Sequence, residues 1–275
     1  MKIAIDLGGT NIRVGAIENG KVVHKVSAPC PSKAGEEEVL SFLIKLIEDA
    51  MPSNPEGIGI GVPSVVDTEH GIVYNVANIP SWQEVHLKDI LEQRFKIPVF
   101  VNNDSNCFAL GEKLFGECVP YSDVIGITLG TGVGAGVIID GKLYNGVNTG
   151  AGEIGSLSYL DYDYEHYCSS GFFVKYHHTT GKEAYEKAIA GDVQAKTVWN
   201  EIGAHLGNLM KAVLYTYDPE AIVLGGGIAA AYPLFSESMF NVMSDFPYKK
   251  TVENIKILVS QREDISLLGA SALVV

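Results

Sequence analysis

Residues 2–23 read KIAIDLGGTNIRVGAIENGKVV, and residues 124–144 read VIGITLGTGVGAGVIIDGKLY. Each stretch is an apolar run, a glycine-rich turn, a second apolar run, a turn that ends in glycine, and the start of a third run. Short apolar runs bounded by glycine turns are typical of β-strands joined as hairpins. Both stretches therefore predict three consecutive strands.

The two stretches resemble each other at a nearly constant spacing. Asp6 aligns with Thr128, 122 residues further on, and Gly20 aligns with Gly141, 121 residues further on, so one residue is gained or lost between these points. The repeat predicts a duplicated structural unit. Two unrelated hairpins with similar turn residues would give the same pattern, because such turns are common.

Apolar residues elsewhere recur at helical or strand spacing. Within residues 194–217 they fall at steps of three and four, at Val198, Ile202, Leu206, Leu209, Val213 and Tyr217. The same reasoning predicts further helices over residues 36–51, 86–95, 105–115, 182–190 and 235–243 and near the C-terminus, and strands over 57–63, 97–103, 221–224 and 255–260. Both halves thus share the order strands, helix, strand, which indicates an α/β fold.

The chain of 275 residues is long enough for two lobes. No low-complexity linker separates its halves, and we place the boundary between Cys118 and Asp123. We therefore expect an N-terminal lobe of residues 1–120 and a C-terminal lobe of residues 121–275. The last helix is expected to return to the first lobe, since the termini of a folded chain often lie close together.

The composition excludes several classes of protein. Hydrophobic residues make up 47% and charged residues 19%, as in globular proteins, and the net charge of −13 disfavours binding to a nucleic-acid backbone. The four cysteines contain no C-x-x-C pair, which favours reduced thiols. No signal peptide or membrane-length apolar run is evident, so we expect a cytoplasmic protein without nucleic-acid or membrane partners.

Glycine is enriched, with 30 residues, or about 11% against a usual 7%, and it clusters in turns. In the first turn, Asp6 is followed by Gly8, Gly9, Thr10 and Asn11. Backbone N–H groups of such a turn can converge on phosphate oxygens, and Asp6 can meet a metal ion carried by a nucleotide. A tight hairpin in which Asp6 only caps the turn is the alternative.

Two further turns use the same device. The second turn, which repeats the first, contains Gly130, Thr131 and Gly132. The third turn lies between a predicted strand and a predicted helix and contains Gly225, Gly226 and Gly227. The third turn allows close backbone approach to a base or a sugar. Three such turns in one acidic chain are hard to explain by structure alone, so we interpret them as nucleotide-binding turns.

Together with other motifs, these turns resemble the ROK family of bacterial sugar kinases and repressors, within the actin-like ATPase fold. The motifs occur in the family's order across nearly the whole chain: DLGGTNIRVG, GIGIGVPSVVD, NIPSW, VNNDSNCFALGE, LGTGVGAGVIIDGKLYNG, GAGEIG and IVLGGGI. The resemblance implies an α/β fold of duplicated actin-like ATPase (ribonuclease H-like) lobes with a cleft between them. It also implies that the first lobe binds sugar and phosphate and the second binds the nucleotide.

The resemblance assigns roles to individual residues. The ATP phosphates are expected at the turns that contain Gly8 to Thr10 and Gly130 to Gly132, and the adenosine near Gly225 to Gly227. The hexose is expected against Asn78, Asn103, Asp104 and Glu153. The implied cofactors are ATP and Mg²⁺, and the resemblance also allows a homodimer.

Asp104 is the residue that the family would use as the base for the attacking sugar hydroxyl. Its position between a predicted strand and a predicted helix also suits a helix N-cap, where the helix dipole favours the ionised form. The two roles are compatible, because a well-placed carboxylate can orient a hydroxyl and accept its proton late in phosphoryl transfer.

The sequence departs from the family after GAGEIG. Most members continue with a histidine and then a cysteine-rich zinc loop, whereas this chain has Ser156 and then YEHYCSSGFFVKYHH. Of the family's zinc ligands, Cys168 is the one clearly kept in this chain. His166 could replace a second ligand, and His177 and His178 lie nearby in the sequence. Structural zinc, however, normally takes four Cys or His ligands. We therefore expect no metal site of the chain's own, and fewer contacts to the anomeric side of the sugar.

Two classes of protein are alternatives to a kinase. A ROK repressor would carry a DNA-binding domain before the first strand, and here a strand is expected from Lys2. A sugar sensor that has lost turnover is made plausible by Ser156, while Asp6, the phosphate turns and Asp104 argue against it. The sequence therefore predicts an ATP-dependent kinase of a hexose or N-acetylhexosamine, with glucose as first choice ahead of fructose and N-acetylated amino sugars.

Overall fold

The computed structural model describes residues 1–275 and divides into two compact units. Unit 1 comprises residues 1–120, 136–151 and 262–275, and unit 2 comprises residues 121–135 and 152–261. The first break falls between Pro120 and Tyr121. Residues 136–151 are grouped with unit 1, which the sequence did not indicate.

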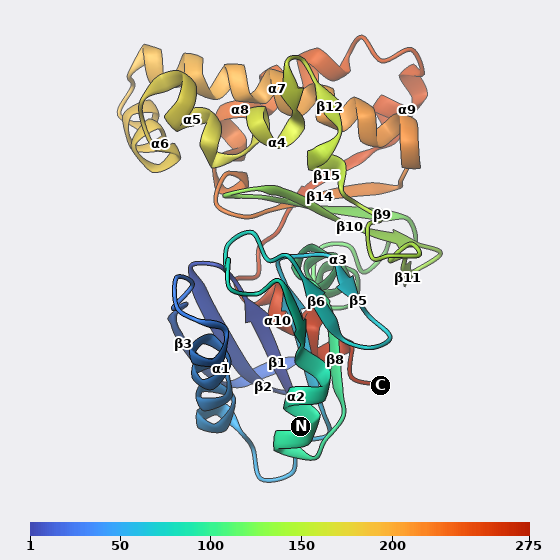
Figure 1. The fold of residues 1–275 in the computed structure, drawn as a ribbon. Helices are drawn as coiled ribbons and strands as arrows, with labels where there is room; N and C mark the ends of the chain where they lie inside the picture. The colour runs from blue at the N-terminus through green and yellow to red at the C-terminus, as the bar shows by residue number, and fades with distance from the viewer. The chain divides into compact units, whose positions relative to one another are not determined.

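Unit 1 is built around a five-stranded sheet in the order β3-β2-β1-β4-β8. Strands β1, β2 and β3 are antiparallel neighbours, whereas β1, β4 and β8 are parallel. Its helices lie around this sheet (Figure 1), and its remaining strands belong to other sheets. The elements are β1 (Lys2–Leu7), β2 (Asn11–Glu18), β3 (Lys21–Pro29), α1 (Glu36–Ala50), β4 (Ile58–Val62), β5 (Val66–Asp67), β6 (Ile72–Tyr74), β7 (Glu84–His86), α2 (Leu87–Phe95), β8 (Val99–Asn103), α3 (Asp104–Phe115), β11 (Lys142–Leu143) and α10 (Ile265–Ala272).

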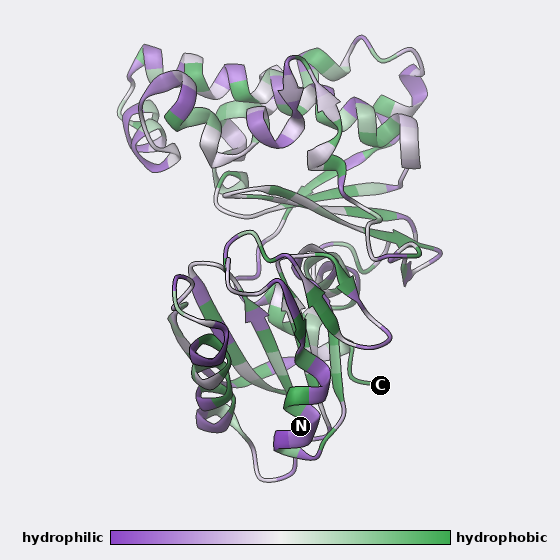
Figure 2. Ribbon diagram, in the orientation of Figure 1, coloured by the Kyte–Doolittle hydropathy of each residue, from purple (hydrophilic) through white to green (hydrophobic).

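Helices cover both faces of this sheet, so its inner strand β4 is buried along its whole length. Every residue of β4 is buried, as expected for a parallel strand packed on both sides. The apolar side of α1 packs on one face through Val39, Leu43 and Ile47. Figure 2 shows this division, with hydrophobic residues along the strands and hydrophilic residues on the outer turns of α1.

The other face is packed against α10 at very short range. A Cβ on Gly59 of β4 would lie 1.8 Å from the Ala270 carbonyl oxygen, and a Cβ on Gly269 would lie 1.7 Å from the Cys107 carbonyl oxygen. Only glycine fits at such backbone contacts. The C-terminal helix therefore packs closely against both β4 and α3.

Unit 2 contains most of a second five-stranded sheet, in the order β11-β10-β9-β14-β15, in which β9, β14 and β15 are parallel. Its long helices α7 and α8 pack together where Gly203 and Gly207 of α7 face Phe235 and Met239 of α8. Its elements are β9 (Val124–Leu129), β10 (Val133–Ile139, which begins in unit 2 and ends in unit 1), η1 (Ile154–Ser156), β12 (Ser158–Tyr159), β13 (Tyr162–Asp163), α4 (Tyr164–Cys168), α5 (Ser170–His177), α6 (Gly181–Ile189), α7 (Val193–Tyr217), β14 (Ala221–Gly225), η2 (Ala229–Ala231), α8 (Tyr232–Met243), α9 (Lys249–Asn254) and β15 (Lys256–Val259).

The predicted repeat is present in the structure. In both copies the second turn has positive φ at its two central residues, Asn19 and Gly20 in the first and Asp140 and Gly141 in the second. This is the geometry of a type I′ hairpin turn, for which Asn-Gly and Asp-Gly are the preferred pairs. The chain thus closes the two hairpins in the same way.

The structure also locates the residue by which the copies differ in length. The first turn closes with a hydrogen bond from the Gly8 N–H to the Asn11 carbonyl at 2.9 Å, and the second with one from the Gly130 N–H to the Gly132 carbonyl at 3.0 Å. The first turn is therefore one residue longer. None of the helices combines the length and the hydrophobicity that a membrane-spanning helix needs.

Candidate functional site

The carboxyl ends of the parallel strands bring two acidic residues of unit 1 together. Asp6 lies in β1, Asp104 follows β8, and Gly61 of β4 lies between them in register with Asp6. A Cβ on Gly61 would lie 3.3 Å from the Asp104 Cα, so glycine leaves room between the strands. Ligands of α/β sheets commonly bind at this edge.

Asp104 is the first residue of α3, and the predicted cap role belongs to its neighbour. The Asn103 side chain is the N-cap and accepts hydrogen bonds from the Ser105 and Asn106 N–H groups at 2.8 and 3.2 Å. The expectation that Asp104 caps the helix is corrected in this respect, although its Oδ1 also accepts from the Ser105 N–H at 2.8 Å. Burial, as the larger cause, and the charge of Asp6 together raise the pKa of Asp104 to about 7, although the hydrogen bonds from Ser105 oppose this shift. These two effects outweigh the expected help from the helix dipole.

Asp6 has a partner that the sequence reasoning missed. Arg13 of β2 lies directly opposite Asp6 of β1, and its guanidinium binds the Asp6 Oδ2 through both Nε, at 3.0 Å, and a terminal nitrogen. The alternation of a strand places residues 6 and 13 on the same face once the hairpin is assumed, so the sequence contained this signal. The pair is partly buried and leaves the Asp6 Oδ1 for other partners.

The first glycine turn packs against Asn78, one of the residues predicted to contact the sugar. A Cβ on Gly9 would lie 2.2 Å from the Asn78 Cβ, so glycine is required at residue 9 for Asn78 to pack there. Thr10 and Asn11 are exposed, and the Thr10 carbonyl accepts a hydrogen bond from the Cys30 N–H at 2.8 Å. The structure thus places Gly8, Gly9, Thr10, Asn11 and Asn78 at one location in unit 1.

Asn103 is held by unit 1 itself. While its Oδ1 caps α3, its Nδ2 donates to the Ser64 carbonyl at 3.2 Å. The second hydrogen of the amide group is the donor that a sugar hydroxyl could use. The structure therefore fixes the orientation of Asn103 before any ligand is considered.

Three asparagines behind Asp104 form a network that the sequence gave no reason to expect. Asn106 Nδ2 donates to Asn102 Oδ1 at 2.9 Å and to Asn145 Oδ1 at 3.2 Å, and Asn102 Nδ2 donates to Asn145 Oδ1 at 3.1 Å. Asn102 and Asn106 are almost fully buried. The network joins the end of β8, the first turn of α3 and the loop after β11, and so restricts the backbone that carries Asp104.

In unit 2, the second and third glycine turns meet at the carboxyl ends of β9 and β14. The Ile228 N–H donates to the Leu129 carbonyl at 3.1 Å, which joins the residues after the third turn to those before the second. A Cβ on Gly226, whose φ is +85°, would lie 2.3 Å from the Leu129 carbonyl oxygen, so this glycine is required by the fold. Gly227 and Gly130 have no atom within 4 Å of an added Cβ and are open to a ligand.

The remaining predicted residues of these turns differ in exposure. Gly225 is buried in β14 and pairs with Thr128 of β9, so it contributes to the sheet. Thr131 is exposed at the tip of the second turn. Gly132 lies against the carboxylate of Glu165, where a Cβ would come within 2.6 Å of Oε2. Glu165 is a second residue that the sequence reasoning did not single out.

Glu153 lies immediately before η1, and its side chain is exposed. Partial burial raises the pKa of Glu153, and the nearby charge of Glu165 raises it further. Ser156, the residue at the family's histidine position, is exposed at the end of the same short helix. Glu153 therefore has a carboxylate that can accept hydrogen bonds from hydroxyl groups.

An aromatic cluster occupies the segment where the family has its zinc loop. His166 stacks on Tyr162 at 3.9 Å between ring centroids and its Nε2 lies 2.8 Å from the Tyr176 hydroxyl, while Tyr159 stacks on Tyr164 at 4.3 Å. Cys168 is fully buried, and burial raises the pKa of its thiol well above the usual range. The structure contains no group of three or more His, Cys, Asp or Glu side chains that could hold a metal ion, so the donor set does not fit a structural zinc.

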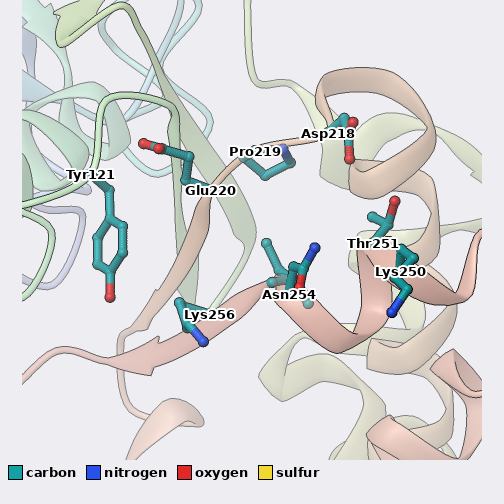
Figure 3. A pocket seen from close by; sticks show the side chains of 9 residues that line it. Tyr121, Asp218, Pro219, Glu220, Lys250, Thr251, Asn254 and Lys256 are labelled. Atoms are coloured by element: carbon teal, nitrogen blue, oxygen red, sulfur yellow. The ribbon is translucent and has the colours of Figure 1, made fainter.

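A separate depression of about 400 Å³ in unit 2 contains none of the predicted site residues. Figure 3 shows the Tyr121, Asn254 and Lys256 side chains around it. Glu220, which also lines it, accepts hydrogen bonds from the Ser122 and Asp123 N–H groups. Most of the residues that line it have polar side chains and are exposed, which indicates a solvent-filled surface feature.

The two five-stranded sheets, each of which begins with one copy of the repeat, have the actin-like ATPase fold, and this chain resembles solved ROK kinase structures of the same fold. The ROK glucokinase of Streptomyces griseus, solved in complex with glucose and AMPPNP, superposes with a TM-score of 0.87 at 28% identity, over 99% of this chain and 98% of that chain. The ROK hexokinase of Thermus thermophilus gives 0.84 at 26% identity, over 99% and 97% of the two chains.

The sequence pattern of the ROK family matches residues 2–275, so this chain belongs to the ROK family. Glucokinase of Thermotoga maritima is 28% identical over 99% of this chain and 96% of its own length. The xylose repressor of Caldicellulosiruptor bescii is 29% identical over 99% of this chain and 77% of its own length. The relatives thus include both kinases and repressors.

Proposed function

We propose that this protein is an ATP-dependent kinase that transfers the γ-phosphate of ATP to a hydroxyl group of a hexose. The observation that carries the proposal is Asp104, a carboxyl group with a pKa of about 7 at the carboxyl edge of a parallel sheet, beside the Asp6–Arg13 pair. Perturbed carboxyl groups with a specific charged neighbour are typical of catalytic sites. The similarity to glucokinases supports the same activity.

In this proposal Asp104 accepts the proton of the attacking hydroxyl group. The hydroxyl oxygen forms a bond to the γ-phosphorus, the bond between that phosphorus and the bridging oxygen breaks, and ADP leaves. A base with a pKa of about 7 is about half ionised at neutral pH and matches the task of general-base catalysis. The Asn102, Asn106 and Asn145 network holds its backbone in place.

The proposed sugar contacts are Asn78, Asn103, Asp104 and Glu153. The Asn103 side chain is fixed by three intramolecular hydrogen bonds, so it loses little conformational freedom when it binds a hydroxyl. Glu153 is exposed, so its carboxylate can accept hydrogen bonds from sugar hydroxyl groups, and the charged neighbour that affects its pKa is the acidic Glu165. We propose glucose as the first substrate to test, followed by fructose and N-acetylated amino sugars.

The residues also fit the two proposed cofactors. The open glycines Gly130 and Gly227 allow a phosphate or a base to approach the backbone closely. Asp6 offers the carboxylate oxygen Oδ1, and oxygen atoms are the ligands that Mg²⁺ prefers. A bound Mg²⁺ would supply neutralisation of charge on the phosphates.

A sugar sensor without turnover is the second candidate, because the relatives include xylose repressors. Production of ADP in the presence of Mg²⁺, ATP and each hexose of a panel distinguishes the two candidates. A kinase gives hexose-dependent ADP and the sugar phosphate in equal amounts. Binding of a hexose by calorimetry without ADP production above background would establish the sensor instead.

A further inference from the structure

One carboxylate of unit 2 holds the second glycine turn directly. Glu165 lies in α4, whose first turn is capped by the Asp163 side chain, which accepts from the His166 N–H at 2.7 Å. The Glu165 Oε2 accepts a hydrogen bond from the Val133 N–H at 3.0 Å. Val133 is the first residue of β10 and follows the turn immediately, so Glu165 fixes the end of the turn.

The same segment also holds the start of the turn. The Ser170 N–H, at the beginning of α5, donates to the Gly130 carbonyl at 2.8 Å. Ser169, the N-cap of α5, accepts from the Gly171 N–H at 3.2 Å. Residues 165–170 therefore bind the turn at Gly130 and at Val133, on both sides of Thr131 and Gly132.

This segment is anchored firmly enough to serve as a support. Tyr164, Tyr167 and Cys168 are buried, and the ring stacks of Tyr164 on Tyr159 and His166 on Tyr162 attach it to β12 and β13. Closely packed aromatic side chains restrict motion of the backbone that carries them. A hydrogen bond from such a segment can therefore restrict the turn.

We propose that Glu165 is a positioning residue for nucleotide binding, which holds the Gly130–Val133 turn in shape through the Val133 N–H. The inference rests on the proposed function, because it takes this turn as a phosphate site. Glu165 also places an exposed negative charge against Gly132, which opposes an approaching phosphate. The hydrogen bond and the charge thus have opposite effects on ATP affinity, and two substitutions separate them.

Glu165→Gln keeps an oxygen that can accept from Val133 and removes the charge, whereas Glu165→Ala removes both. We expect Glu165→Gln to bind ATP about 2- to 5-fold more tightly than the wild type, the size of an exposed charge interaction. Glu165→Ala should bind ATP about 3- to 10-fold more weakly than Glu165→Gln, the size of one hydrogen bond. Affinity for the hexose should change less than 2-fold in both variants.

Hydrogen exchange supplies a readout without any ligand. Exchange at the backbone amides of residues 130–133 should be faster in Glu165→Ala than in Glu165→Gln and the wild type, because the turn loses its support. Glu237, an exposed residue of α8 in the same unit, gives the control pair Glu237→Gln and Glu237→Ala. Neither control should alter exchange at the turn or the affinity for ATP.

Equal ATP affinities in Glu165→Ala and Glu165→Gln, or unchanged hydrogen exchange in Glu165→Ala, would overturn the positioning role of Glu165. Neither result would affect the proposed kinase function. If the wild type binds ATP but makes no hexose-dependent ADP, the proposed function fails and the positioning of the nucleotide stands. If the wild type binds no ATP by calorimetry, both proposals fail, whatever the exchange data show.

Discussion

The two glycine turns have nearly the same sequence and quite different surroundings. In the first, Asp6 pairs with Arg13 across the hairpin, and Gly9 lies beneath Asn78. In the second, Thr128 takes the place of Asp6 and donates to the Gly134 carbonyl at 3.4 Å. At the position where the first copy has the Asp6–Arg13 ion pair, the second copy thus has a long hydrogen bond donated by the Thr128 hydroxyl group.

The supports of the two turns differ in the same way. The second turn is held at both ends by residues 165–170, through Glu165 and Ser170. The first is packed against the residue proposed to contact the sugar. The two hairpins thus form similar loops whose neighbours differ: acidic side chains lie at the first loop, and an open backbone surface lies at the second.

The largest expected effect is on turnover when the base is removed. Asp104→Asn should lower kcat by about 10² to 10⁴, the usual loss for a positioned general base, while hexose binding persists. Asp89→Asn, at an exposed position of α2, is the control. Steady-state kinetics together with calorimetric hexose binding test the role, and a near-normal kcat would remove Asp104 from it.

The next effect concerns Glu153, the sugar contact proposed in unit 2. Glu153→Ala should raise the KM for the hexose by about 10- to 150-fold and leave the KM for ATP unchanged, because one charge-assisted hydrogen bond is worth about 1.5 to 3 kcal/mol. Initial rates with each substrate varied in turn measure both constants. A rise in the KM for ATP instead would assign Glu153 to the nucleotide.

The pH dependence of kcat/KM tests the raised pKa of Asp104. Asp104 must be ionised to accept a proton, and its pKa is raised to about 7, so kcat/KM should fall about tenfold per pH unit below pH 7. A profile of kcat/KM between pH 5 and 9 measures this limb. Activity that is flat down to pH 5 would show that Asp104 has an ordinary pKa or a different role.

The raised pKa has a consequence for stability that can be measured without activity. The folded state keeps the Asp104 proton up to about pH 7, whereas the unfolded chain releases it near pH 4, so this group destabilises the fold increasingly as the pH rises through that range. Asp104→Asn should therefore have a higher Tm than the wild type at pH 8, and the difference should vanish toward pH 4. Thermal unfolding at both pH values is the measurement.

The smallest expected effect is a difference in Tm between alanine substitutions in the two glycine turns, because the turns have different neighbours. Gly9→Ala places a Cβ 2.2 Å from the Asn78 Cβ and should destabilise the fold by about 1 to 3 kcal/mol, lowering Tm by several degrees. Gly130→Ala meets no atom within 4 Å and should leave Tm unchanged, while it weakens ATP binding if phosphate approaches this backbone. Equal Tm losses in both variants would contradict the contrast.

The sequence alone was sufficient for the repeat, for most of the longer strands and helices, and for the positions of the glycine turns. It did not predict the short strands β5, β6, β7, β12 and β13 or the helices α4, α5 and α9. The period of apolar residues and the Asn-Gly and Asp-Gly turns are local properties, since they depend on residues only a few positions apart. The helix predicted over residues 194–217 is observed over Val193–Tyr217 for this reason. The family resemblance likewise rests on short motifs.

Only the tertiary structure decided which side chains meet. The cap role of Asn103, the Asn102–Asn106–Asn145 network and the contact of Glu165 with Val133 join elements that are distant in the chain or depend on where a helix begins. The raised pKa of Asp104 has the same origin, because burial and the distance to Asp6 are set by packing of β1, β4 and β8. Local pattern fixes which strands and turns form, whereas electrostatics and hydrogen bonding at the site depend on contacts that only the packed chain creates.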